Sequence, residues 1–190
     1  MHSIEPYFAW RDYYIASEDK LSPFYRKEYS EFEFTDKIYN YYIHPQWDSF
    51  GSSTLYCKVL FADYENQSAI IELIGEWNDA LHNDIMELKN GLINPMLENG
   101  ITKFILIGEN VLNFHASDEL YYEEWYDDIK EEGGWIVAVN FREHIITEMQ
   151  KHRIHYYLHL GQKYNDVLWR KFKPADFCVF VESLLLKYIG

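Results

Sequence analysis

Short apolar runs alternate with amphipathic stretches along most of this chain, and this alternation constrains its fold more than any other feature. Runs that are apolar throughout, or at every second residue, are typical of strands. We expect five of them, at 54–64, 69–75, 101–108, 135–141 and 154–160. Helical periodicity predicts helices at 78–100, 118–132, 142–153 and from Pro174 onward. Strands that alternate with helices predict an α/β fold with a mixed, mainly parallel sheet and helices packed on it.

The stretch 78–100 shows the helical period most clearly. Its apolar residues recur at spacings of four, three and four, at Leu81, Ile85, Leu88 and Leu92. A side-chain oxygen of Asn78 or Asp79 can accept a hydrogen bond from a first-turn amide and so begin the helix. Gly100 can adopt the left-handed conformation that ends it. Pro95 lacks an amide hydrogen, so we expect a kink or an early end there.

The N-terminal part of the chain is rich in aromatic residues mixed with charges, and aromatics make up 18% of the whole sequence. The segment SEFEF (30–34) alternates Phe with Glu, which predicts a half-buried strand. The segment 37–47 places three residues on one side, Tyr39, Tyr41 and Ile43. Turn-forming residues at 48–53 mark a boundary. We therefore expect an aromatic-rich N-terminal elaboration at 1–53 and an α/β core with a C-terminal helix at 54–190.

The N-terminal aromatics have two interpretations. Tyr and Trp bury a large area while keeping a polar tip, so they can pack as an extra layer over the sheet. They are also frequent at interfaces between proteins. If the layer leaves a sheet edge free, a homodimer can form through that edge.

The charge balance excludes two classes of partner. The chain carries 17 basic and 31 acidic residues, a formal net charge of −14. Nucleic acids and anionic membranes attract basic surfaces, so neither is expected to bind. No stretch approaches the roughly 20 apolar residues needed to cross a bilayer, and the first residues lack the pattern of a signal peptide. We therefore expect a cytoplasmic protein.

The motifs of common enzyme classes do not occur in this sequence. The nucleophile-elbow, dinucleotide-binding and phosphate-binding glycine patterns are all missing. The cysteines Cys57 and Cys178 are far apart, and the histidines show no metal-binding spacing. We therefore expect no catalytic activity, no cofactor and no metal. A hydrolase that pairs His115 or His144 with nearby carboxylates is the remaining enzymatic alternative.

Three stretches together resemble the STAS domain, the fold of anti-sigma-factor antagonists and of sulphate-transporter tails. They are AIIELIGEWNDA, a strand that ends in Gly-Glu before a helix; KFILIGENVLNFHASDEL, a strand and a Phe-centred turn; and GGWIVAVNFREHIITEM, the following strand and helix. The resemblance covers roughly residues 54–161. It implies a STAS-like core and a regulatory role in which a partner kinase phosphorylates a Ser or Thr at the helix start after the Phe-centred turn.

The position that the resemblance marks for phosphorylation carries an acid in this chain. Alignment of the flanking apolar residues Phe114 and Leu120 places it on Asp118, one residue after Ser117. A fixed carboxylate could mimic a phosphorylated state, or the switch could be absent. A shift of one residue would make Ser117 the target. Capping alone is the other interpretation, with Ser117 as the N-cap and two acids beside the positive end of the helix dipole.

The function that we expect is that of a non-catalytic protein-interaction or regulatory module. Its partner would be another protein, such as a regulatory kinase or an anti-sigma-like factor. Docking would use the segment 110–119, with the candidate residues Asn113, His115, Ser117, Asp118 and Glu119. The next helix carries an acid at every fourth residue: Glu123, Asp127 and Glu131. These acids form either a solvated face or a docking patch for a basic protein. The alternative function is binding of a small molecule or lipid in a pocket between the N-terminal layer and the sheet.

Overall fold

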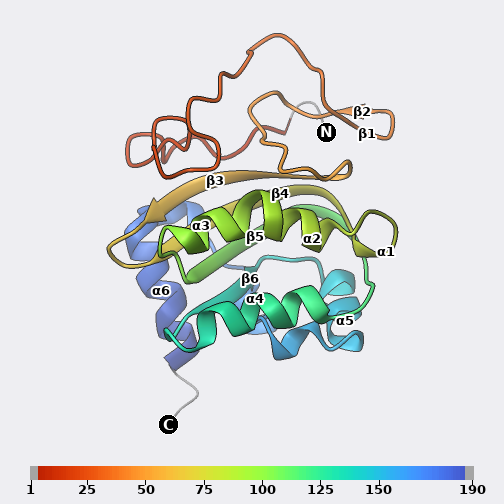
Figure 1. Ribbon diagram of the computed structural model, residues 1–190, viewed down its shortest axis with the longest axis vertical. Helices are drawn as coiled ribbons and strands as arrows, with labels where there is room; N and C mark the ends of the chain where they lie inside the picture. Colours follow the sequence, from red (N-terminus) through yellow and green to blue (C-terminus); the bar gives the residue numbers. More distant parts are fainter. Residues whose placement is uncertain (1–3, 187–190) are drawn as a thin grey trace.

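A four-stranded mixed sheet forms the centre of the computed structural model, which describes residues 4–186 (Figure 1). Its strands lie in the order β3-β4-β5-β6. Their bounds are Leu55–Asp63, Ser68–Asn78, Lys103–His115 and Trp135–Val139. The hairpin β3–β4 is antiparallel, whereas β4–β5 and β5–β6 are parallel. The prediction of an α/β fold with a mixed, mainly parallel sheet is therefore confirmed.

Helices connect the parallel strands and cover both faces of the sheet (Figure 1). The first connection contains α1 (Asp79–His82), α2 (Asp84–Leu88), a π-helical turn (Lys89–Ile93) and α3 (Asn94–Glu98). Helix α4 (Leu120–Lys130) joins β5 to β6, and α5 (Glu143–Lys151) follows β6. Three short 3-10 turns, Ile154–Tyr156, Gln162–Tyr164 and Trp169–Lys171, lead to α6 (Pro174–Leu186). No helix within residues 4–186 has the length and apolar character needed to cross a membrane.

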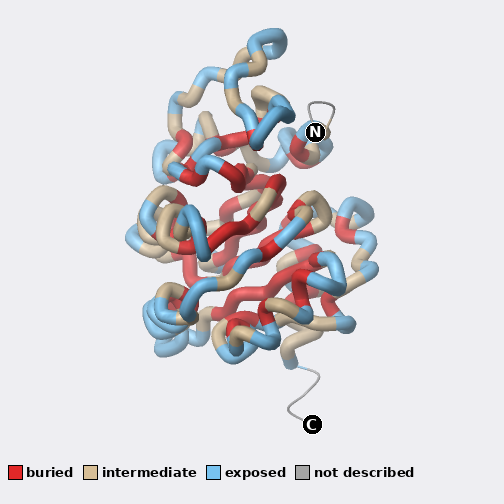
Figure 2. Tube along the Cα trace, turned by 90° about the vertical axis from the view of Figure 1, so that its right-hand side faces the viewer, coloured by how far each residue is buried: buried red, intermediate tan, exposed pale blue. Residues whose placement is uncertain are grey.

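The core consists of two main layers, one on each face of the sheet. Successive strand side chains point to opposite faces. Ile71 and Leu106 therefore pack under the helices α2 to α5. Ile70 and Ile105 pack on the opposite face, against α6 and the N-terminal Trp10. Figure 2 shows that buried segments are concentrated in and around the sheet.

The single helix predicted at 78–100 is broken into shorter pieces. As a result, Leu81, which was predicted to lie in the core, is exposed. Asn78 caps α1 as predicted, because its side chain accepts a hydrogen bond from the amide of Leu81 at 3.0 Å. The helix stops after one turn, since Asn83 adopts the left-handed conformation with φ 51°. Leu81 is therefore 79% exposed rather than buried, whereas the other three residues of the predicted stripe lie in the core: Ile85, Leu88 and Leu92.

Buried carboxylates explain the break at Asn83. Asp84 accepts hydrogen bonds from the Ser52 and Thr54 hydroxyls and from the Asn78 amide. Asp79 accepts one from the amide of Ile85 at 2.9 Å. A continuous helix could not satisfy both acids in this way. The irregularity expected near Pro95 takes the form of the π-helical turn that precedes it.

The N-terminal part contains less regular structure than predicted. No strand forms at 30–34, and Phe32 is 85% exposed. The next segment forms only a two-residue hairpin, β1 (Lys37–Ile38) and β2 (Tyr41–Tyr42). Tyr39 and Tyr41 are exposed, so they do not share a buried side with Ile43. The alternation of Phe and Glu was misleading because no neighbouring strand pairs with it.

The prediction of a fifth strand at 154–160 is wrong. The buried residues of this segment are Ile154 and Leu158. They are four residues apart, and the chain between them forms a helical turn rather than a strand. Only His159 pairs with β6, through bonds of 2.8 Å to the backbone of Ile136 and Ala138. This single bridge covers the outer edge of β6. At the opposite edge of the sheet, Asp48 forms a bridge with Cys57 and so covers the outer edge of β3 at one point.

Candidate functional site

The predicted docking segment lies at the end of β5 and in the link to α4. The strand does not end at Gly108 as predicted but continues to His115. Asn113 is in register with Glu76 of β4, and His115 with Asn78. The extension arises because β4 is also long, so that the two parallel strands pair over nearly their whole length.

All five predicted docking residues are reachable from solvent. The side chains of Asn113, His115, Ser117 and Asp118 are exposed, and Glu119 is half-buried. Phe114, between the first two, is buried against the ring of Trp77 at 6.0 Å between ring centroids.

The N-cap of α4 lies two residues after its predicted place. Glu119, not Ser117, directly precedes α4, and its side chain makes no capping bond. Asp118 instead accepts a hydrogen bond from the amide of Leu120 at 3.2 Å. Within residues 4–186, the Ser117 hydroxyl has no hydrogen-bond partner. The amide at the start of α4 therefore bonds to Asp118, and the Ser117 hydroxyl is left without a partner among the described residues.

Three exposed residues that sequence reasoning did not assign to this site lie beside it. Leu81 and Leu120 are 79% and 63% exposed, and both follow the ends of adjacent strands, where Asn78 pairs with His115. Tyr39 reaches the same place, because its hydroxyl donates to Glu76 at 2.6 Å, and Asn113 donates to the same carboxylate at 3.2 Å. We call this surface the docking edge; it comprises Tyr39, Leu81, Asn113, His115, Ser117, Asp118 and Leu120.

Helix α4 continues the docking edge with an acidic face. The carboxylates that repeat every four residues are exposed, as expected: Glu123, Asp127 and Glu131. Two other acids of this helix bind the buried Lys89, with Nζ at 2.9 Å from Glu124 and 3.0 Å from Asp128. Lys89 therefore anchors α4 to the first connection. Of the repeated acids, Asp127 pairs with Lys130 at 2.7 Å, whereas Glu123 and Glu131 keep their charge in solvent.

The groups needed by the hydrolase alternative do not converge. His144 Nε2 lies 2.9 Å from the backbone oxygen of Leu112. His115 is exposed, and no acid or hydroxyl contacts it within the described residues. Nor do any three His, Cys, Asp or Glu side chains of residues 4–186 form a group that could hold a metal ion.

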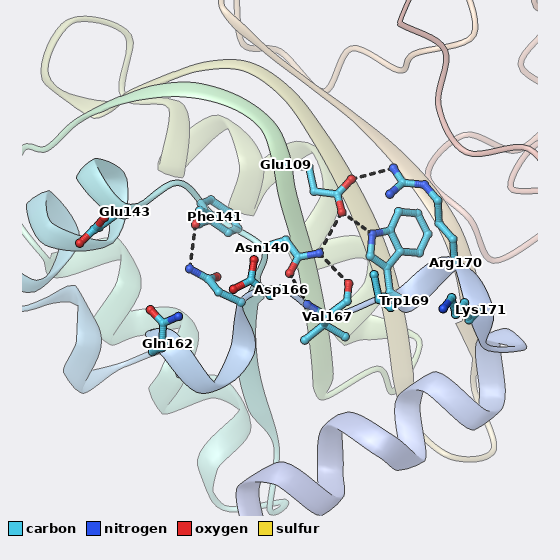
Figure 3. A pocket seen from close by; sticks show the side chains of 12 residues that line it. Glu109, Asn140, Phe141, Glu143, Gln162, Asp166, Val167, Trp169, Arg170 and Lys171 are labelled. Carbon is cyan, nitrogen blue, oxygen red and sulfur yellow. Dashed lines mark hydrogen bonds and ion pairs between the residues drawn. The ribbon is translucent and has the colours of Figure 1, made fainter.

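A second candidate site is a cleft of about 730 Å³ at the carboxyl end of β6, beside the middle of β5 (Figure 3). Glu109 of β5 and Asn140, which follows β6, form its floor. The segment 162–171 forms one wall, and the start of α5 contributes Glu143. Ligands in open α/β sheets commonly bind outside the carboxyl ends of the strands. Sequence reasoning missed this cleft because its walls come from segments about 60 residues apart in the chain.

Glu109 organises the cleft floor. Its Oε1 accepts hydrogen bonds from Asn140 Nδ2 and Trp169 Nε1, both at 2.8 Å, and its Oε2 lies 2.7 Å from Arg170 Nη2 (Figure 3). Burial alone would raise the pKa of Glu109, but the bonds from Arg170, Asn140 and Trp169 lower it below its usual value. The carboxylate therefore stays ionised and fixes the position of the guanidinium.

A smaller cavity of about 250 Å³ lies between the N-terminal segment and β3. This is where the alternative function places a pocket. Four aromatic residues line it, together with Lys58: Tyr7, Trp10, Tyr14 and Tyr29. Lys58 is held by Asp48 at 3.1 Å, and its ammonium lies over the ring of Tyr29.

Comparisons with known proteins assign the chain to no family. No protein-family model matches the sequence, and no curated protein matches it.

Proposed function

We propose that this protein is a non-catalytic, cytoplasmic protein-interaction or regulatory module that docks a partner protein through the docking edge. The observation that carries the proposal is the exposure of two large apolar side chains, Leu81 and Leu120, beside the polar residues of the predicted segment. Interfaces combine apolar anchors with a polar rim in this way. The resemblance to anti-sigma-factor antagonists supports the same surface, because their regulated position lies at the corresponding helix start.

The charge of this surface favours a partner with a basic face. Asp118, Glu119 and the acidic face of α4 are adjacent, and the whole chain carries a formal net charge of −14. Complementary charges at the rim of an interface accelerate association and exclude wrongly charged partners. A regulatory kinase or an anti-sigma-like factor with a basic docking surface would satisfy this requirement.

Two forms of regulation are compatible with the helix start. Asp118 can act as a fixed negative charge at the position that is phosphorylated in the family it resembles. Alternatively, a kinase can modify Ser117, whose hydroxyl is exposed and has no hydrogen-bond partner in the described chain. Phosphorylation there would add negative charge to an already acidic edge and strengthen the attraction to a basic partner.

A charge-reversal pair tests the docking edge. We expect Asp118→Lys to weaken partner binding by about two- to thirty-fold, because an exposed ion pair contributes about 0.2–1 kcal/mol and reversal roughly doubles the effect. Asp176→Lys is the matched control, since Asp176 is an exposed first-turn acid of α6, on the opposite face of the sheet. The measurement is quantitative affinity purification of both variants and the wild type from native cells, at low and high salt.

The proposal predicts proteins that Asp118→Lys loses and Asp176→Lys retains, and their capture by the wild type should decrease with salt. Equal capture by all three proteins, with both variants folded by circular dichroism, would contradict it. Binding of a small molecule stays the second candidate because the 250 Å³ cavity lies under the N-terminal aromatics. It ranks second because binding pockets usually measure about 300–1,000 Å³.

A further inference from the structure

The cleft at the carboxyl end of β6, beside the middle of β5, contains polar groups that the fold itself does not use. Gln162, Asp166, Lys171 and Glu143 line it, and their side chains are exposed. None of these four side chains has a hydrogen-bond or ion-pair partner within residues 4–186. In contrast, the side chain of the floor residue Asn140 makes three hydrogen bonds, to Glu109 and to the backbone of Val167. The cleft thus combines a fixed floor with free polar groups on its walls.

The free charges are separated along the cleft. Figure 3 shows Glu143 and Gln162 at one end and Arg170 and Lys171 at the other, with Asp166 between them. One end can therefore attract a cation, whereas the other can attract an anion. A ligand that carries only positive or only negative charge would match only one end of the cleft.

The cationic end is held in place before any ligand binds. The guanidinium of Arg170 lies 4.2 Å from the centroid of the Trp169 ring, and one of its nitrogens binds Glu109 at 2.7 Å. A guanidinium has five N–H donors, so the others stay available for a carboxylate. Lys171, next in the chain, adds a second positive charge that no acid within residues 4–186 pairs with.

Apolar groups also line the cleft. Val167, Leu168 and Trp169 belong to the wall formed by the segment 162–171, and Leu168 is largely exposed. The volume of about 730 Å³ lies within the range of about 300–1,000 Å³ that is usual for small-molecule sites. An apolar side chain of a ligand would cover Leu168 while the ligand's charged ends reach the two ends of the cleft.

We propose that this cleft binds a short peptide with free ends and an apolar side chain, because the carboxylate and the ammonium group of such a ligand are far enough apart to reach the two ends of the cleft. Its carboxylate would contact Arg170 and Lys171, and its ammonium group would contact Glu143 and Asp166. This site is distinct from the docking edge and does not depend on the proposed docking function, because the two surfaces share no residue.

Titration calorimetry and NMR on the full chain test the proposal. The probe is the tripeptide Ala-Leu-Ala, and the same tripeptide with an acetylated amino end and an amidated carboxyl end is the uncharged control. Leucine, whose two charged groups share one carbon atom, is the control for the distance between the charges. We expect the free tripeptide to bind, the blocked tripeptide to bind at least about two-fold more weakly, and leucine to bind more weakly than the free tripeptide, since each exposed charge pair contributes about 0.2–1 kcal/mol.

Two variants place the binding in the cleft. Lys171→Glu should weaken binding of the free tripeptide by about two-fold or more. Lys173→Glu makes the same change two residues later, outside the cleft lining, and should leave the affinity unchanged. The proposal is overturned if the free tripeptide does not bind at about 10 mM, if leucine binds as tightly as the tripeptide, or if Lys171→Glu and the blocked ends leave binding unchanged.

Discussion

Glu72 is the clearest case of a single residue whose environment sets its chemistry. It lies in the middle of β4, and only 1% of it is exposed. Its Oε2 accepts a hydrogen bond from the Tyr7 amide at 2.8 Å, and Arg170 lies 3.9 Å from Oε1. Burial raises the pKa of Glu72 from 4.5 to about 7, although the Tyr7 bond and Arg170 oppose the increase.

This raised pKa predicts a specific dependence of stability on pH. Between pH 4.5 and about 7 the folded protein holds a proton on Glu72 that the unfolded chain has released, so stability decreases as the pH rises through this window. We expect the Glu72→Gln variant to lack this decrease while keeping an acceptor for the Tyr7 amide. Relative to wild type, its free energy of unfolding should increase by about 2–3 kcal/mol between pH 4.5 and 8.

Denaturant unfolding of both proteins at several pH values measures this difference. Burial also raises the pKa of Asp79, to about 6, and that group lowers stability over an overlapping pH range. Because Asp79 is present in both proteins, its effect cancels when one is subtracted from the other. A difference that stays constant with pH would show that Glu72 has an ordinary pKa.

At the scale of elements, the sequence predicted the four strands of the sheet and the helices between them, but not how the helices are interrupted. The spacing of Ile85, Leu88 and Leu92 depends only on local geometry, so it identified the first connection correctly. The break at Asn83 depends on hydrogen bonds from distant residues such as Ser52 to Asp84, which no local pattern encodes. The predicted strand at 154–160 failed for a related reason, because apolar residues four apart fit a turn as well as a strand.

The π-helical turn in the first connection allows a test at the same scale. A Cβ atom at Gly91 would overlap the backbone oxygen of Phe50. We expect Gly91→Ala to lower the free energy of unfolding by about 1–3 kcal/mol, since backbone atoms cannot yield as a side chain can. Asn90→Ala, at the exposed neighbouring position, should change stability by less than about 0.5 kcal/mol. Chemical denaturation followed by circular dichroism measures both; equal stability of the two variants would contradict the close contact.

For the whole molecule, the two candidate sites differ in how far the sequence could predict them. The predicted docking residues lie at the end of one strand and directly after it, so a local pattern and a family resemblance were enough to select them. The remainder of the docking edge depends on Tyr39 crossing from the N-terminal part to Glu76. The cleft joins Glu109 to Trp169, and that contact exists only after the C-terminal segment has packed on the sheet. Neither could be inferred without the fold.

The same long-range packing predicts that the N-terminal part and the core unfold together. Trp10 is buried, its indole N–H donates to the backbone oxygen of Phe172 at 3.0 Å, and its ring contacts Trp169 at 5.3 Å between centroids. We expect Trp10→Ala to destabilise the protein by about 3–5 kcal/mol, because it removes a large side chain from the layer under α6. Phe8→Ala, two residues away at an exposed position, should cost less than about 1 kcal/mol.

The number of transitions tests whether residues 1–53 behave as a separate unit. If they are joined to the core through Trp10, unfolding followed by tryptophan fluorescence and by far-ultraviolet circular dichroism will coincide in the wild type and in both variants. In Trp10→Ala the single transition would shift to lower denaturant concentration as a whole, because the lost contact supports the sheet as well as the N-terminal segment. Two separate transitions, with only the first sensitive to Trp10→Ala, would mean instead that the N-terminal part folds on an already stable core.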